Sequence, residues 1–316
     1  MSDDEDVTFT HLDQPLTGET GVTKRDLVDY LDALADRIVP VLADRPLSVV
    51  RVRPGQEPFM QKNVPKHAPD WIRTVTIPAR SSQREVRYAL GNDRRTLLWF
   101  ANQRAVEFHV PLSPVGSGQS HLVLDLDPPP EGPFAVVAAA AHLVRRVLDE
   151  VGLDSVVKTS GAKGLHVFVP LEPTFSIEDV AAATRAVAAR AERLDPALTT
   201  TAFIRDDRGG RVFLDSTRAG SATVVAAYSP RIRPGLPVSF PLRWDEIDAV
   251  TPGDFTIRTA PERLGDADPW RELMPAPQAL DADLVAEGHT IPVARVQAMH
   301  EGKRRKRAAA DPNPPA

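Results

Sequence analysis

The segment HLVLDLDPPP, residues 121–130, constrains the fold of this chain more than any other part of the sequence. Its apolar run has the length of a short buried strand, and three prolines in succession end that strand because proline lacks a backbone N–H. Side chains alternate across a strand, so Asp125 and Asp127 share one face while Leu124 and Leu126 point into the core. The segment therefore predicts a core strand whose end carries two neighbouring carboxylates.

Two buried carboxylates at this spacing repel each other unless a cation lies between them. Hard divalent ions such as Mg²⁺ or Mn²⁺ prefer oxygen ligands and also bind phosphates, so the pair is a candidate metal site. The alternative is a strand end whose acidic residues cap the following helix. The apolar run before the pair and the proline stop after it favour the metal site.

The periodicity of the remaining sequence predicts helices and strands in mixed order. We expect helices at 23–44, opened by a capping box of Thr23 and Asp26, at 92–109, 134–152, 176–194 (opened by Ser176) and 241–247, and strands at 47–53, 84–90, 155–159, 165–171, 211–215 and 221–229. The order strand, helix, hairpin, helix, strand in the centre combines antiparallel pairing with helical crossovers. This predicts an α/β (α+β) fold rather than a doubly wound parallel sheet.

Composition sets the organisation and excludes several classes of protein. The chain has 316 residues, and 42% hydrophobic content is enough for a large core. We expect residues 1–20 to form a flexible or draped arm and residues 21–287 to form the folded part. Residues 288–316 are expected to form a basic, Ala/Pro-rich tail that is disordered at its end. The absence of cysteine excludes disulfides and cysteine zinc sites.

Charge and hydropathy give an expected location. The 38 Lys and Arg against 43 Asp and Glu leave a net charge of −5, which does not by itself indicate a nucleic-acid partner. The acidic N-terminus is unlike a secretory signal, and no apolar run approaches the roughly 20 residues of a membrane span. We expect a cytoplasmic, soluble protein with no membrane contact.

Other residues extend the candidate site. The turn KTSGAKGLH brings together Ser160, Lys163 and His166 around two glycines, a composition that suits an anion but also an ordinary tight hairpin. Asp215 ends a later strand and is either a third metal ligand or a turn former. Arg231 lies in a proline-stiffened loop suited to phosphate contact. His109, at the end of a predicted helix, is either a cap or a substrate ligand.

Taken together, LVLDLDP, TSGAKGLHV, FLD and AYSPRIRPGLPVSFPLRWDEI resemble the polymerase domain of bacterial DNA ligase D and its stand-alone relatives, primase-polymerases of the archaeo-eukaryotic primase superfamily. The segments MQKNVPKHAPDWIRTV and NDRRTLLWFANQRAVEFHVPLS are also similar to that family, so the resemblance runs from about residue 20 to about residue 285. It implies a two-lobed primase-polymerase fold with an RRM-like catalytic sheet flanked by helices. It also implies template-directed addition of nucleotides with two Mn²⁺ or Mg²⁺ ions.

The resemblance assigns roles to individual residues. Metal binding and catalysis fall to Asp125, Asp127 and Asp215, and nucleotide binding to His109, Ser160, Lys163, His166, Arg218 and Arg231. Arg218 stands in a segment, Ser216 to Ala219, that departs from the family's polar stretch and is one residue shorter. DNA binding falls to Arg51, Arg53, Phe59, Lys62 and Lys66. Of these, Arg51, Arg53 and Lys62 would contact a downstream 5′-phosphate, and Phe59 a template base.

The resemblance further implies partners and a biological setting. It predicts NTP or dNTP substrates with a preference for ribonucleotides, and gapped or primer-template DNA during non-homologous end joining at the nucleoid. No K-x-D-G ligase signature occurs, so a separate DNA ligase and a Ku-like end-binding protein are expected, with the chain itself a monomer. Two alternatives remain open: a haloacid-dehalogenase-type phosphatase, whose first Asp is a nucleophile, and a non-catalytic DNA-end-binding module.

Overall fold

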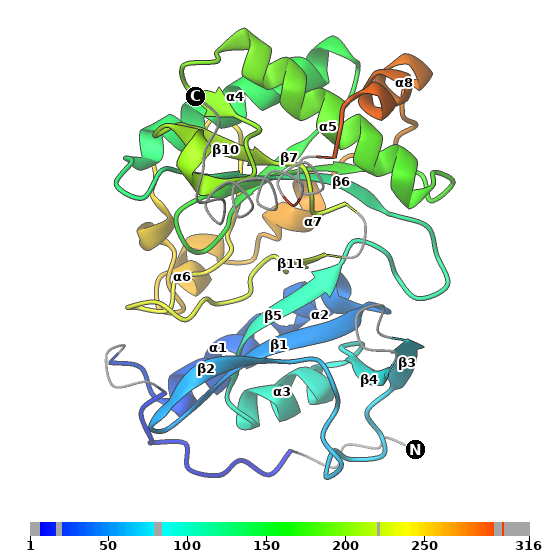
Figure 1. Cartoon of the computed structure of the whole chain (residues 1–316). Coiled ribbons are helices and arrows are strands. Elements are labelled where there is room, and N and C mark those ends of the chain that lie inside the picture. Colours follow the sequence, from blue (N-terminus) through cyan, green and yellow to red (C-terminus); the bar gives the residue numbers. More distant parts are fainter. Residues whose placement is uncertain (1–6, 17–20, 79–83, 220–221, 294–298, 300–316) are drawn as a thin grey trace, which may run out of the picture.

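The computed structural model describes residues 7–16, 21–78, 84–219, 222–293 and 299. In these residues the chain forms two lobes, each built on a six-stranded sheet (Figure 1). Helices α1, α2 and α3 belong to the first lobe, and helices α4, α5 and α8 lie on the outer side of the second. The expected α/β (α+β) fold with two lobes is confirmed.

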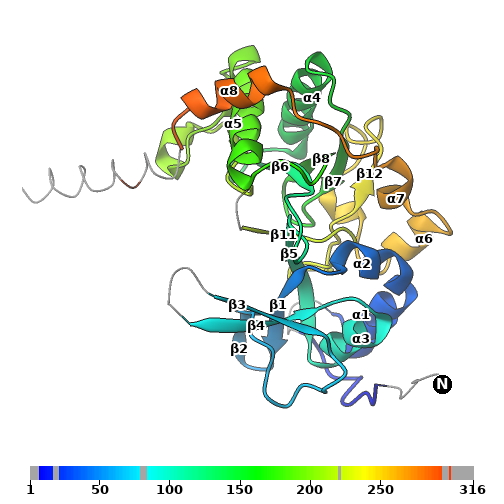
Figure 2. The same cartoon turned by 90° about the vertical axis from the view of Figure 1, so that its right-hand side faces the viewer.

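The first lobe is formed by the N-terminal third of the chain and one strand from much later. Its elements are α1 (Lys24–Ala33), α2 (Ala35–Leu42), β1 (Pro46–Arg53), β2 (Gln56–Gln61), β3 (Thr74–Pro78), β4 (Glu85–Leu90), α3 (Arg94–Asn102) and β5 (Ala105–Pro111). The sheet has the order β11-β5-β1-β4-β3, with β2 paired to β1, so β11 (Thr223–Val225) completes it at the edge beside β5. Figure 2 shows β5 and β11 between the two lobes.

The predicted helix at 92–109 is wrong in its second half. Helix α3 ends at Asn102, and Arg104 has a φ of 61°, which turns the chain in the left-handed region and stops the helix. The next seven residues form strand β5, where β-branched and aromatic side chains favour an extended backbone. His109 is therefore a strand residue and not a helix cap.

Several further elements differ from the sequence predictions. The predicted helix at 23–44 is two helices, because the backbone of Leu34 leaves the helical region; the apolar spacing continues across the break and does not reveal it. The predicted helix at 241–247 is instead the two-residue strand β12 (Pro241–Leu242) followed by turns. Strands β2 and β3 were not predicted. The capping box of Thr23 and Asp26 is confirmed.

The second lobe has the predicted order of strand, helix, hairpin, helix and strand. Its elements are β6 (His121–Asp127), α4 (Phe134–Glu150), β7 (Val156–Thr159), β8 (Leu165–Pro170), α5 (Ile177–Leu194), β9 (Thr199–Thr200), a 3₁₀ turn (Arg205–Arg208) and β10 (Val212–Asp215). The sheet order is β12-β7-β8-β6-β10-β9. The four central strands pair antiparallel, which is the RRM-like arrangement that the resemblance implied.

Successive side chains of β6 point to opposite faces of the sheet, so one face packs in the core of the second lobe and the other is polar. Leu122, Leu124 and Leu126 are fully buried, and β6 contacts helices α4 and α5. Asp125 and Asp127 point to the opposite face, toward the first lobe. The sheet therefore presents its carboxylates on the side that its helices leave uncovered.

The C-terminal part of the described chain covers the second lobe. It contains a 3₁₀ turn (Pro252–Asp254), α6 (Ala260–Leu264), α7 (Pro269–Leu273) and α8 (Ala282–Thr290). Helix α8 packs on α5 and continues past the predicted boundary at residue 287. The remainder of the predicted tail, apart from residues 291–293 and 299, lies outside the described residues.

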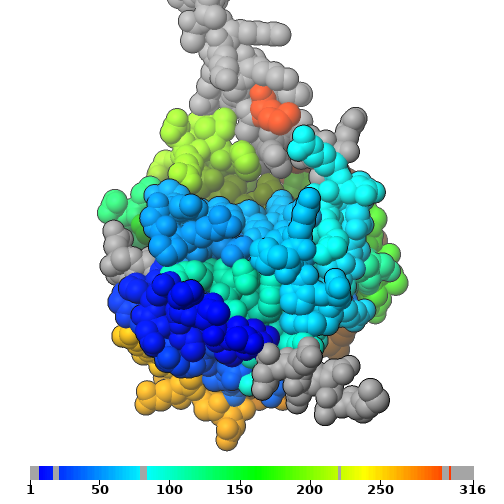
Figure 3. All heavy atoms as spheres, turned by 90° about the horizontal axis from the view of Figure 1, so that it is seen from below, coloured from blue at the N-terminus to red at the C-terminus, as the bar shows by residue number. Residues whose placement is uncertain are grey.

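At the N-terminus, only residues 7–16 of the predicted arm are described. They lie on the surface of the first lobe, in dark blue in Figure 3, and Leu16 is buried. The backbone N–H of Lys24 donates to the carbonyl of Gln14, which ties this segment to the start of α1. In the described part of the chain, no helix has both the length and the apolar character needed to cross a membrane.

Candidate active site

A row of polar side chains crosses the uncovered face of the second sheet. Lys158 on β7 is paired with His166 on β8, His166 with Asp125 on β6, and Asp125 with Asp215 on β10. Directly paired residues of neighbouring strands project to the same face. Register alone thus brings Asp215, about ninety positions later in the sequence, beside Asp125, with Asp127 two residues farther along β6.

Asp125 is the most heavily bonded of the three carboxylates. Its Oδ1 lies 3.1 Å from His166 Nε2, and its Oδ2 lies 2.8 Å from an Arg218 guanidinium nitrogen. Burial alone raises the pKa of this carboxyl, but His166 and Arg218 outweigh burial and hold the pKa well below its ordinary value. Asp125 is therefore ionised at neutral pH.

Asp127 has the opposite environment. Among the described residues, its carboxylate has no hydrogen-bond or ion-pair partner. Burial and the negative charges of Asp125 and Asp215 raise its pKa to about 6. A cation at this place would relieve the repulsion.

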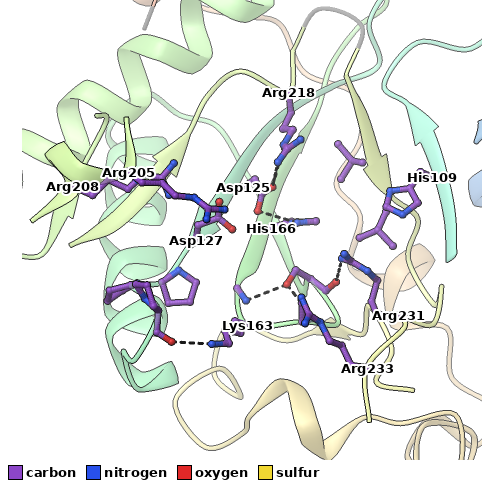
Figure 4. Close-up of a pocket in the computed structure, with 18 of the residues that line it drawn as sticks. His109, Asp125, Asp127, Lys163, His166, Arg205, Arg208, Arg218, Arg231 and Arg233 are labelled. Carbon is purple, nitrogen blue, oxygen red and sulfur yellow. Dashed lines mark hydrogen bonds and ion pairs between the residues drawn. The ribbon is translucent and has the colours of Figure 1, made fainter. Parts of the chain in front are cut away.

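The three carboxylates suit a hard divalent ion in their chemistry but are not yet arranged around one. Among the residues that the structure describes, no three acidic or histidine side chains are close enough together to enclose a metal. Figure 4 shows Arg218 against Asp125, and the Nε of Arg218 also lies 3.3 Å from Asp215 Oδ2. Three carboxylates are the kind of donor set that Mn²⁺ and Mg²⁺ prefer.

Behind His166 lies a buried lysine that the sequence analysis did not single out. Lys158 is fully buried, and its Nζ lies 2.9 Å from His166 Nδ1 and 2.6 Å from Ser239 Oγ. Burial, chiefly, lowers the pKa of Lys158 far below its ordinary value, and burial together with Lys158 lowers that of His166 to about 4. The imidazole is therefore neutral, and it donates through Nε2 to Asp125 because Lys158 donates to Nδ1.

The glycines of the turn 160–164 are required by close packing. Gly161 has a φ of 69°, and a Cβ there would lie 2.6 Å from Arg231 Cγ; a Cβ on Gly164 would lie 2.2 Å from the carbonyl oxygen of Leu126. Ser160 Oγ accepts from the N–H groups of residues 162 and 164, and Lys163 Nζ donates to the carbonyl of Pro130 at 2.8 Å. The turn is thus fixed against both β6 and the Arg231 loop.

The first lobe supplies the opposite wall through His109, which is held by Glu107, a residue that the sequence analysis missed. Glu107 Oε2 lies 2.9 Å from His109 Nε2 and 3.1 Å from Arg231 Nε, and Oε1 accepts from the N–H of Ile232. Although burial raises the pKa of Glu107, these partners lower it to about 2. One carboxylate therefore orients both His109 and Arg231. The only signal in the sequence is its spacing of two from His109.

These residues surround one cleft between the lobes, with a volume of about 620 Å³ (Figure 4). Asp125, Asp127, His109, Ser160, Lys163, His166, Arg218 and Arg231 all line it, as do Arg205, Arg208, Arg211 and Arg233. The run RDDRGGR at 205–211 was not identified from sequence as part of the site, although its density of arginine was visible. The cleft combines a carboxylate cluster with many cations, as a site for a metal-bound polyphosphate requires.

A family model for the LigD primase-polymerase domain matches residues 23–270, which include every residue that lines the cleft. The chain belongs to this family. Primase-polymerases join nucleotides, so the family is one of nucleotidyltransferases. The resemblance that the sequence motifs indicated is confirmed.

The similar proteins that are known agree with the family. The bifunctional non-homologous end joining protein LigD of Bacillus subtilis is 34% identical over 262 residues, covering 81% of this chain and 42% of that protein. The multifunctional LigD of Mycobacterium tuberculosis is 36% identical over 255 residues, covering 77% and 33%. The chain thus spans less than half the length of these relatives.

A solved structure gives the same result for the fold. The polymerase domain from Mycobacterium tuberculosis ligase D, in complex with DNA, superposes with a TM-score of 0.78 at 33% identity, covering 85% of this chain and 98% of that domain. The two-lobed arrangement is therefore that of a LigD primase-polymerase domain.

Within this LigD-type fold, the residues predicted to bind DNA lie in the first lobe. The Arg53 guanidinium stacks over Phe59 at 4.8 Å from the ring centre, while Lys62 and Lys66 are exposed on the loop after β2. Arg51 differs, because it is 8% exposed and donates to Gln61 and to the carbonyl of Gln103. Arg53, Lys62 and Lys66 are thus free to meet a phosphate, whereas Arg51 serves mainly to hold the hairpin.

Proposed function

We propose that this chain is a divalent-metal-dependent, template-directed nucleotidyltransferase that adds nucleotides to a primer 3′-hydroxyl. One observation carries the proposal: Asp125 and Asp127, with Asp215 paired beside Asp125, lie at one end of a cleft whose other walls are lined by cations. A nucleoside triphosphate has the complementary charge, with its reactive α-phosphate toward the carboxylates and its remaining phosphates toward the basic residues.

In the proposed reaction, the primer 3′-oxygen forms a bond to the α-phosphorus, and the bond to the bridging oxygen breaks so that pyrophosphate leaves. Two Mn²⁺ or Mg²⁺ ions held by the three aspartates would promote ionisation of the hydroxyl and neutralise the leaving phosphates. Arg231 and Lys163 would bind the triphosphate from the Glu107 side and the turn side respectively. Arg231 forms an ion pair with Glu107 and donates a hydrogen bond to the carbonyl of Ser160. These contacts fix its guanidinium in advance, which lowers the cost of ordering it on binding.

The nucleotide's sugar is the natural partner of His109. This imidazole lines the cleft on the first-lobe side and is held by Glu107. A hydrogen bond from His109 to a 2′-hydroxyl would give the proposed preference for ribonucleotides, because a deoxynucleotide would leave the imidazole unpaired.

We also propose the setting that the relatives' names indicate. As their names state, the similar proteins act in non-homologous end joining, and this chain would fill short gaps or extend broken ends at the nucleoid. DNA would lie along the first lobe, with a downstream 5′-phosphate near Arg53 and Lys62. A separate DNA ligase would seal the product, with a Ku-like protein holding the ends.

A primer-extension assay on gapped and primed DNA tests the proposal. The wild type should extend only with template and with Mn²⁺ or Mg²⁺, and Asp125→Ala or Asp127→Ala should lower the rate by at least about a thousandfold while gapped-DNA binding persists. Asp149→Ala on the outer face of α4 is the matched control and should extend normally. Extension by either active-site variant at the normal rate would rule out this active site.

The same assay separates the alternatives. A phosphatase would release phosphate without template, and a non-catalytic end-binding module would bind DNA ends but never extend them in any metal. Either result with the wild type would contradict the proposed function.

A further inference from the structure

Arg218 occupies the place between two of the three carboxylates. Its Nε lies 3.1 Å from Asp125 Oδ2 and 3.3 Å from Asp215 Oδ2, and its Nη2 lies 2.8 Å from Asp125 Oδ2. One guanidinium thus bridges the two strands β6 and β10. Figure 4 shows it entering the carboxylate cluster from the end of the cleft opposite Arg231.

The remaining oxygens of these two carboxylates also have partners. Asp125 Oδ1 accepts from His166, and Asp215 Oδ1 accepts from the N–H and hydroxyl of Thr217 at 2.8 and 2.6 Å. A divalent ion that binds both aspartates must therefore replace at least the Arg218 contacts. Because the ion and the guanidinium are both cations, they cannot share the same two oxygens without strong repulsion.

Arg218 has an alternative position within reach. Its side chain is 33% exposed and lines the same cleft as Lys163 and Arg231. The chain on its N-terminal side is anchored because Thr217 is bonded to Asp215. A planar guanidinium binds phosphate oxygens in the same two-pronged manner as carboxylate oxygens, so the transfer costs no change of donor geometry.

We propose that Arg218 is an internal counter-ion that exchanges with the divalent metal: it holds Asp125 and Asp215 in the metal-free protein and moves to the nucleotide's triphosphate when the metal binds. The inference rests on the proposed function, since it assigns the order of events at the same site. Metal and triphosphate then assist each other's binding, because the metal releases the arginine and the triphosphate accepts it. Arg218 is a positioning residue for both.

The first experiment measures Mn²⁺ binding to the metal-free full chain without nucleotide, by calorimetry. Arg218→Gln should bind Mn²⁺ about tenfold more tightly than the wild type, and Arg218→Lys, which keeps the charge but loses the double contact, should fall between them. Arg233→Gln removes the same charge from the same cleft and should change Mn²⁺ affinity less than about twofold. Thermal melting of each metal-free variant verifies that it is folded.

The second experiment measures binding of a non-hydrolysable nucleoside triphosphate in EDTA and in saturating Mn²⁺. Arg218→Gln should match the wild type in EDTA, where the arginine is held by the carboxylates, and should bind about tenfold more weakly in Mn²⁺. Equal or weaker Mn²⁺ affinity of Arg218→Gln in the first experiment, or equal loss of triphosphate affinity with and without Mn²⁺ in the second, overturns the exchange. Both experiments measure binding alone, so a wild type that fails to extend primers would contradict the proposed function without deciding this inference.

Discussion

At the scale of single residues, the three aspartates are not equivalent even though they lie side by side. His166 and Arg218 stabilise Asp125 as an anion. The carboxylate of Asp127 has no such partner, and burial together with the charges of Asp125 and Asp215 raises its pKa to about 6. Asp127 is therefore the first of the aspartates to take up a proton as the pH falls toward 6. Below its pKa, a metal ion must displace that proton in order to bind.

This difference predicts the pH dependence of metal binding. Above pH 6 Asp127 is ionised and available, and below pH 6 a proton competes with the metal, so Mn²⁺ affinity should fall up to about tenfold per pH unit between pH 6 and pH 5. Because the folded pKa lies above the unfolded one, Asp127 favours folding of the metal-free protein most at low pH and loses this effect as pH rises through 6. Calorimetric Mn²⁺ titrations at pH 5, 6 and 7 test this, and equal affinities at pH 5 and 7 would contradict it.

Glu107 gives a second prediction at this scale. Glu107→Gln removes the charge that orients His109 and Arg231, so the KM for the nucleotide should rise about tenfold through loss of one charge-assisted contact. Steady-state extension kinetics give the value, with Glu150→Gln on the outer end of α4 as control. An unchanged KM would show that the two side chains are positioned without Glu107.

At the scale of elements, prediction from sequence succeeded where local signals and packing agreed. The β6 segment, its proline stop, helices α4 and α5 and the hairpin around residues 160–164 all have periodicity or turn residues that act locally. Prediction failed for strand β5 and for the division of the first helix into α1 and α2. The left-handed backbone of Arg104 and the helix break at Leu34 leave no mark in the hydrophobic pattern. The three aspartates could be named from motifs, but Glu107 acts through Arg231, far later in the sequence, and Lys158 through His166 on the neighbouring strand and through Ser239.

The contact between α5 and α8 predicts whether the substitution Gly288→Ala stabilises or destabilises the protein. Gly288 lies in α8, and a Cβ there would be 1.9 Å from the carbonyl oxygen of Ala182 on α5. Helix propensity alone predicts that Gly288→Ala stabilises by roughly 1 kcal/mol. Overpacking instead predicts destabilisation by about 1–3 kcal/mol and a Tm lower by several degrees, since α8 must move away from α5.

Thermal melting decides between these signs. Ala286→Ser, at an exposed position of the same helix, is the control and should change Tm by less than about one degree. A Tm of Gly288→Ala above that of the wild type would show that α8 moves away from α5 at no cost.

At the scale of the whole molecule, the net charge of the chain is negative, whereas most of the charged residues that line its cleft are positive. The chain carries a net charge of −5, yet its cleft is lined by Lys163, Arg205, Arg208, Arg211, Arg218, Arg231 and Arg233. The acidic residues lie mainly elsewhere. An acidic protein of this kind attracts a polyanion only at its basic surface, which restricts how DNA approaches.

Salt dependence of DNA binding tests this arrangement. The affinity for gapped DNA should fall steeply with salt, and Arg205→Gln or Arg211→Gln should each lower the slope of log affinity against log salt by about 0.7 to 0.9. Arg146→Gln on the outer face of α4 should leave the slope unchanged. Fluorescence anisotropy at several salt concentrations gives the slopes, and identical slopes for all three variants would place the DNA elsewhere.

The pairing of β11 with β5 has a consequence for synthesis of the protein. Val225 pairs with His109, so the first lobe receives its edge strand only after strands β6 to β10 of the second lobe have been made. A nascent chain that ends before β11 exposes the unpaired edge of β5, and such an edge promotes aggregation. Cleavage between the lobes should therefore not yield an N-terminal fragment that folds alone: the two lobes are separate in shape but a single unit in folding.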